Sequence, residues 1–183
     1  MKEKIVLLFL ADCLIFTIMN AQDPEQKIEY RPIGFFHSPL TPQTGAPRQG
    51  ILASDIEGKI EIYDEYQKAL ESLEMFEYII VLYHFDKIRG WKDIVVPPGS
   101  NRDHNFGLFA TRSPSRPNPI GFAIIKLERI ENNILYISGI DAFDGTPVLD
   151  IKPYLPSIDC VKSKRNESVE KDLGLMNHDN VNE

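Results

Sequence analysis

Two arginines and one asparagine are concentrated in a short proline-rich stretch, and arginine binds carboxylates and phosphates through bidentate contacts. They are Arg112, Arg116 and Asn118, within residues 105–121. Three prolines separate or follow them, and each proline fixes its own φ and restricts the residue before it. The stretch therefore predicts a rigid loop that holds an anionic group. The alternative is a rigid connection whose arginines pair with neighbouring carboxylates.

The loop lies in a locally basic part of an acidic protein. The chain has 183 residues and a formal net charge of -7, which excludes a polycation that coats nucleic acid. From Lys87 to Arg116, however, six lysines and arginines stand against two aspartates. A local positive field of this kind suits an anionic partner such as a phosphate backbone. A solvated loop is the alternative explanation.

Other residues that can do chemistry lie close to the ends of predicted strands. Arg48 stands between a proline and a glycine, and His84 lies near the end of an apolar run. Asp141 and Asp144 belong to a turn that continues as Gly-Thr-Pro, a tight-turn signal. Each of these residues has a structural alternative: a surface charge, a satisfied histidine, or simply a turn.

No metal site is predicted from the cysteines and histidines. The two cysteines are too few and too far apart for a zinc site or a disulfide framework. The four histidines show no metal-ligand spacing to one another.

Strands must position these side chains, because hydrophobic periodicity predicts few helices. Alternation and apolar runs predict strands at residues 30–37, 58–63, 78–85, 108–112, 120–130, 134–140 and 148–151. One amphipathic helix is predicted after Asp64 as its N-cap, with Tyr66, Ala69, Leu70 and Leu73 on its apolar face. A dinucleotide-binding fingerprint is absent from the sequence. The expected fold is mainly β, a small β-barrel with one flanking helix and long loops.

The two ends of the chain differ from this body. Residues 1–22 resemble a secretory signal peptide, with a basic start and an apolar run, although Asp12 interrupts the run. A start placed too far upstream, or an uncleaved anchor, is the alternative. Residues 23–29 read as a polar lead and residues 157–183 as a polar tail.

Five motifs, in this order and spacing, resemble the TsaA-like family of bacterial and archaeal tRNA methyltransferases. The resemblance covers about residues 30–156, the expected methyltransferase domain. The motifs are Pro47-Arg48-Gln49, Tyr83-His84-Phe85, Gly107-Leu108-Phe109-Ala110-Thr111-Arg112-Ser113, Arg116-Pro117-Asn118-Pro119-Ile120-Gly121, and Asp144-Gly145-Thr146-Pro147-Val148-Leu149-Asp150-Ile151-Lys152-Pro153-Tyr154.

This resemblance implies a single-sheet β-barrel that binds S-adenosyl-L-methionine and forms a homodimer with the site near the subunit interface. The implied reaction moves a methyl group to the exocyclic N6 of threonylcarbamoyl-adenosine beside the tRNA anticodon. By motif match, the residues expected to contact the cofactor are Gln49, Gly50, Ile51, His84, Phe85, Arg112, Phe122, Asp141, Asp144, Gly145 and Thr146.

The substrate side is expected to involve Arg48, Arg116, Asn118 and Lys152. Arg112, Arg116 and Lys152 could each meet the cofactor's carboxylate, the threonyl carboxylate or RNA phosphates. The target nitrogen is amide-like and poorly nucleophilic, so a general base would help. His84 and Asp144 are candidates for it, and the sequence does not assign the role.

Two other classes of function stay open. The chain could be a non-catalytic module, possibly extracytoplasmic, that binds S-adenosyl-L-methionine or a nucleotide, or it could methylate a small metabolite. A tRNA substrate implies the cytoplasm, whereas residues 1–22 suggest export. Contact with a membrane is expected only through that segment, if it is not cleaved.

Overall fold

The computed structural model describes residues 27–97, 105–161 and 169–170. The chain divides into two units, Met1–Tyr30 and Arg31–Glu183. The signal-like segment 1–22 and most of the predicted tail lie outside the described residues. Within the described ranges, no helix has the length and apolarity that a membrane span requires.

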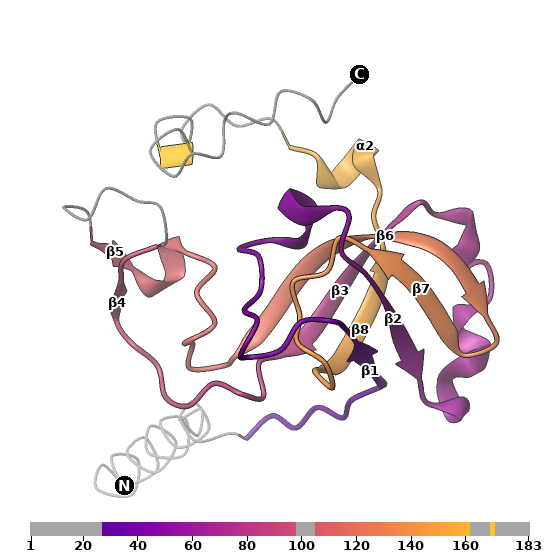
Figure 1. Ribbon diagram of the computed structural model, residues 1–183, viewed down its shortest axis with the longest axis horizontal. Coiled ribbons are helices and arrows are strands. Elements are labelled where there is room, and N and C mark those ends of the chain that lie inside the picture. Colours follow the sequence, from indigo (N-terminus) through magenta and orange to yellow (C-terminus); the bar gives the residue numbers. More distant parts are fainter. Residues whose placement is uncertain (1–26, 98–104, 162–168, 171–183) are drawn as a thin grey trace, which may run out of the picture. The chain divides into compact units, whose positions relative to one another are not determined.

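Six antiparallel strands of the second unit close into a barrel (Figure 1). Their order around the barrel is β1-β2-β7-β6-β3-β8, so the sheet has no free edge. The prediction of a mainly-β, single-sheet barrel is confirmed. The strands are β1 (Gly34–His37), β2 (Glu57–Ile62), β3 (Tyr78–His84), β6 (Ile120–Glu131), β7 (Ile134–Ser138) and β8 (Pro147–Pro153).

Alternate residues of each strand fill the barrel, as the period of a strand requires. On β3 the buried positions are Ile79, Val81 and Tyr83. Tyr83 pairs with Gly121 of β6, where an added Cβ would lie 2.2 Å from the tyrosine ring. Glycine at position 121 therefore leaves the space that the Tyr83 ring occupies, and this places the tyrosine hydroxyl near one end of the barrel.

The remaining described elements are short. Strands β4 (Ile94–Val95) and β5 (Phe106–Gly107) pair with each other outside the barrel. The helices are η1 (Gly50–Ala53), η2 (Asp64–Leu70), η3 (Leu73–Met75), η4 (Leu108–Ala110) and α2 (Pro156–Asp159), of which the four η helices are 3₁₀ helices.

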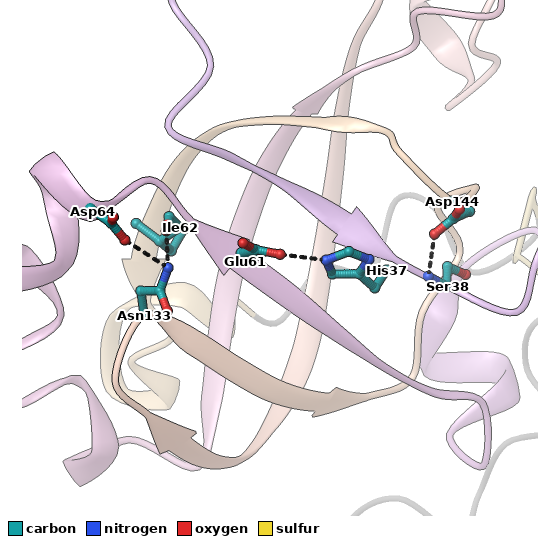
Figure 2. A network of polar contacts seen from close by, with 7 residues as sticks. All are labelled: His37, Ser38, Glu61, Ile62, Asp64, Asn133 and Asp144. Carbon is teal, nitrogen blue, oxygen red and sulfur yellow. Dashed lines mark hydrogen bonds and ion pairs between the residues drawn. The ribbon is translucent and has the colours of Figure 1, made fainter.

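The flanking helix expected after Asp64 is a 3₁₀ helix, η2, and not an α-helix. Its N-cap is Tyr63. The Asp64 carboxylate instead accepts a hydrogen bond from Asn133 Nδ2 at 3.2 Å, and the same amide donates to the Ile62 carbonyl at 2.8 Å (Figure 2). Because the carboxylate is engaged by the turn between β6 and β7, it does not cap the helix. Ser72, with φ of 68°, then separates η2 from η3.

The strand predicted at residues 108–112 is wrong, because residues 108–110 form η4. The Thr111 amide and its hydroxyl both donate to the Leu108 carbonyl, at 3.1 and 2.8 Å. This local bonding replaces a strand ladder. Leu108 is buried and Phe109 is 79% exposed.

Candidate functional site

A cleft of about 1010 Å³ opens where β3 ends and β8 begins. The lining comes from residues 46–52, the end of β3 with residues 85–88, residues 95–97 with 106, residues 109–114, the turn that precedes β8, and Glu170. Pockets that hold small ligands have volumes of this order. The barrel therefore brings together at one end the loops that the sequence singled out.

A half-buried carboxylate holds three of these segments together. Asp141 Oδ1 accepts a hydrogen bond from the Tyr83 hydroxyl at 2.9 Å, and Oδ2 accepts one from the Gly50 amide at 3.2 Å. The tyrosine belongs to β3 and the glycine begins η1. Asp141 therefore ties the turn before β8 to the strand and to the loop that carries Gln49.

Burial and charge shift the titration of this pair. Burial raises the pKa of the Asp141 carboxyl, while the hydrogen bonds from Tyr83 and Gly50 and the nearby Arg112 guanidinium lower it. Burial, and then the charge of Asp141, raise the pKa of the Tyr83 phenol well above its usual range. Tyr83 therefore remains a neutral hydrogen-bond donor, which is the form that an ionised Asp141 requires.

Arg112 joins residues 109–114 to this cluster. Its Nη1 donates a hydrogen bond to Gln49 Oε1, and its guanidinium lies 5.5 Å from the centre of the Phe122 ring. The side chain is exposed. Its position and planar fork suit a carboxylate or phosphate in the cleft.

The structure brings together about half of the residues predicted for the site. Those that line the cleft are Arg48, Gln49, Ile51, Phe85, Arg112, Asp141 and Thr146. Gly50 and Phe122 are not part of the lining but contact lining residues, Asp141 and Arg112 respectively. Those outside the lining are His84, Arg116, Asn118, Asp144, Gly145 and Lys152. Of these, Arg116 contacts lining residues, through the Phe109 ring and the carbonyls of residues 111 and 113.

Asp144 has a structural position in the turn before β8. Its carboxylate accepts a hydrogen bond from the Ser38 amide at 3.1 Å (Figure 2), and its own amide donates to Leu40 at 2.9 Å. Gly145 follows with φ of +74°, a conformation that favours glycine, and donates to Phe36 at 2.8 Å. These bonds fix the turn to the end of β1, and the carboxylate is directed at the backbone.

The other two predicted residues of barrel strands also lie away from the cleft lining. His84 is half-buried at the end of β3, opposite Ile120. Lys152 Nζ pairs with Asp150 at 2.7 Å on β8. No group of three or more metal-binding side chains occurs within residues 27–97, 105–161 and 169–170.

Tyr83 is the main residue of the cluster that was not predicted as a site residue, although it begins the motif Tyr83-His84-Phe85. It lies in the apolar run Tyr78-Ile79-Ile80-Val81-Leu82-Tyr83, where a tyrosine resembles any other core residue. Its partner is 58 residues away along the chain. Its place in that motif is one signal that could have pointed to it, and the buried Gly121 opposite it, which leaves room for a large ring, is another.

Replacing Tyr83 by phenylalanine tests this cluster. The ring contacts with Phe36 and Phe85, at 5.6 and 5.2 Å between centroids, can persist, but Asp141 loses a donor. We expect the free energy of unfolding to fall by about 2 kcal/mol, the cost of a lost bond to a charged group. Chemical denaturation measures it, with Tyr63→Phe, at an exposed tyrosine, as the control. Equal stability of the two variants would contradict the arrangement.

Comparison with known proteins agrees with this geometry. The sequence profile described as "tRNA-methyltransferase O N-terminal domain" matches residues 35–160, more than half of the chain. The chain belongs to the tRNA-methyltransferase O family. The predictions of the TsaA-like family, of a methyltransferase and of S-adenosyl-L-methionine as its cofactor are confirmed at the level of this family.

Relatives that resemble the chain occur in archaea, bacteria and mammals. An S-adenosyl-L-methionine-binding protein of Archaeoglobus fulgidus is 49% identical over 131 residues, which cover 72% of this chain and 92% of the relative. The tRNA (adenine(37)-N6)-methyltransferase of Escherichia coli is 36% identical over 136 residues, or 70% of this chain and 58% of the enzyme.

Solved structures of the family have the same fold. The crystal structure of TrmO from Pseudomonas aeruginosa matches with a TM-score of 0.64 and 36% identity, over 78% of this chain and 62% of that one. The chain thus spans less than two thirds of the length of that structure and of the Escherichia coli enzyme.

Proposed function

We propose that the chain transfers a methyl group from S-adenosyl-L-methionine to the exocyclic N6 of threonylcarbamoyl-adenosine beside the tRNA anticodon. The observation that carries the proposal is the cluster Tyr83–Asp141–Gly50 beside Gln49–Arg112, on the wall of a cleft in a barrel of this family. Relatives named tRNA (adenine(37)-N6)-methyltransferase support the choice of tRNA and of adenine N6.

The residues of the cleft fit the charges of the cofactor. S-adenosyl-L-methionine carries a carboxylate, an ammonium and a sulfonium together with an adenine ring. Arg112 can bind the carboxylate of the cofactor. The Asp141 carboxylate provides a negative charge in the cleft for the ammonium or the sulfonium. Phe85 offers an aromatic face that suits the adenine or the sulfonium. When bound, the cofactor supplies an electrophilic methyl group.

The protein's contribution is chiefly orientation. Methyl transfer needs the nucleophile in line with the methyl group at near-attack distance, and positioning alone can lower the barrier strongly. Asp141 fixes Tyr83 of β3 and Gly50 of η1 relative to each other. Gln49 accepts a hydrogen bond from Arg112 and so fixes the arginine side chain. Because the Asp144 carboxylate is engaged by Ser38 and His84 lies outside the lining, the proposal assigns neither as the general base.

The substrate is proposed to enter between Arg48 and the loop of residues 109–116. Arg48 lines the cleft, and Arg116 and Asn118 belong to the adjacent loop. Lys152 is left out because it pairs with Asp150 away from the cleft lining. A tRNA substrate places the reaction in the cytoplasm. The homodimer implied by the family resemblance stays a prediction.

Mass spectrometry of tRNA nucleosides from a deletion strain tests the proposal. We expect the N6-methylated form of threonylcarbamoyl-adenosine to disappear and to return when the gene is supplied again. Wild-type levels of the methylated nucleoside in the deletion strain would reject this substrate.

One alternative has specific support, because several archaeal relatives are named only as S-adenosyl-L-methionine-binding proteins. A non-catalytic binding module would bind the cofactor and transfer nothing. Calorimetric titration with S-adenosyl-L-methionine, followed by a methylation assay on tRNA, separates the two. Binding without turnover would favour the module.

A further inference from the structure

An aromatic ring is held almost fully in solvent at the rim of the cleft. Phe109 lines the cleft and is 79% exposed, whereas its neighbour Leu108 is buried. Its backbone is nevertheless well fixed: the Leu108 amide donates to the Asp93 carbonyl at 2.8 Å, and Thr111 closes η4. The fold therefore presents this ring to a partner from a rigid support.

An arginine lies over the same ring. The Arg116 guanidinium lies 5.6 Å from the centre of Phe109, which is within the range of a cation–π contact. Its Nη1 donates to the carbonyls of Thr111 and Ser113, at 2.9 and 3.4 Å. Within the part of the chain that the structure describes, no carboxylate forms an ion pair with Arg116, so these backbone bonds fix its orientation without neutralising its charge.

The surroundings of Phe109 combine exposed apolar side chains with positive charge. Ile94 is 58% exposed and pairs with Gly107, two residues before Phe109. In the described residues 86–97 and 105–116, five lysines and arginines stand against two aspartates. The core of a protein–protein interface is usually depleted in charge. Single-stranded nucleic acid, in contrast, is bound by aromatic rings together with cations.

We propose that Phe109 and Arg116 form a stacking platform for an unpaired base of an RNA loop, beside the base that enters the cleft. This inference rests on the proposed function, because an anticodon loop is the single-stranded RNA in question. The platform binds by stacking, which is tolerant of base identity, and Arg116 adds attraction to the RNA. Phe109 would then position the target nucleotide without contacting the cofactor.

The test is the affinity of the protein for a fluorescein-labelled anticodon stem–loop, measured by fluorescence anisotropy at several salt concentrations. Phe109→Ala is expected to weaken binding roughly tenfold, the effect of losing one base–aromatic stack, with an unchanged salt dependence. Phe109→Trp is expected to restore affinity. Arg116→Gln is expected to weaken binding and to reduce the salt slope by about one.

Met75→Ala is the matched control, because Met75 is also 79% exposed but lies on η3, outside the cleft lining. Its RNA affinity should equal that of the unmodified protein. If Phe109→Ala bound RNA as tightly as Met75→Ala, the platform would be refuted. If Phe109→Ala kept its RNA affinity but shifted from dimer to monomer in sedimentation, the surface would be assigned to contact with a second copy of the chain.

The stacking platform and the proposed function can be tested separately. If the unmodified protein methylates tRNA and Phe109→Ala keeps both RNA affinity and rate, only the platform is wrong. If the unmodified protein neither binds nor methylates tRNA, the proposed function fails and the platform fails with it.

Discussion

Replacing Asp141 by alanine is expected to lower kcat/KM for tRNA methylation about 100-fold, a loss typical of misplaced catalytic walls. The substitution leaves the Tyr83 hydroxyl and the Gly50 amide without their acceptor. We also expect it to lower the free energy of unfolding by about 3 kcal/mol, since each unpaired donor costs about 1–3 kcal/mol. A tRNA methylation assay measures the first effect and chemical denaturation the second.

Two further variants separate a loss of function from a loss of folding. Asp141→Asn keeps an oxygen that can accept the Tyr83 hydroxyl, so it should fall between alanine and the unmodified protein in both measurements. Asp55→Ala removes an exposed carboxylate outside the cleft lining and should match the unmodified protein. A folded Asp141→Ala variant with full cofactor affinity and full rate would show that this carboxylate does not organise the site.

Replacing Gly50 by alanine is expected to displace the start of η1. A Cβ there would lie 1.9 Å from the carbonyl oxygen of Gly139 and 2.6 Å from its carbonyl carbon, and backbone atoms cannot move aside as a side chain can. Gly139 itself has φ of +77°, so its carbonyl is held in a conformation that few residues adopt. We expect the free energy of unfolding to fall by about 3 kcal/mol, at the upper end for overpacking.

The same change should weaken cofactor binding, because Gly50 donates to Asp141 and precedes the lining residue Ile51. Gly107→Ala is the matched control: nothing lies within 4 Å of its Cβ position, and its φ of -57° suits alanine. That variant should stay within about 0.5 kcal/mol of the unmodified protein, as surface changes usually do. Equal stability of Gly50→Ala and Gly107→Ala would mean that Gly50 does not pack against the Gly139 backbone as described.

The barrel could be predicted because its signal is local. At residues 59–62 the polar Lys59 and Glu61 alternate with two isoleucines, and in the structure the isoleucines are buried while the polar side chains stay accessible. The short helices were harder to predict, because competing polar contacts determine where they form and of which type they are. Asn133, distant in sequence, engages Asp64, and Thr111 bonds back to Leu108.

The site could be predicted only as a set of loops. Arg112, Gln49 and Asp141 were all expected to belong to it, but their mutual contacts depend on the strand order of the closed barrel. Asp144 shows the limit of this reasoning: a carboxylate in a motif looks chemically available, and the fold uses it to bind the Ser38 amide. Tyr83 shows the opposite case, a residue concealed in an apolar strand whose hydroxyl orders the cleft.

The most direct test is methylation in a purified system with S-adenosyl-L-methionine that carries a deuterated methyl group. The purified chain would be incubated with tRNA that contains threonylcarbamoyl-adenosine, and the nucleosides would be separated by liquid chromatography and mass spectrometry. We predict the deuterated methyl group on N6 of threonylcarbamoyl-adenosine, with no transfer to tRNA that lacks this modification. Bound cofactor with no label in the tRNA, or label on a different nucleoside, would contradict the proposed function.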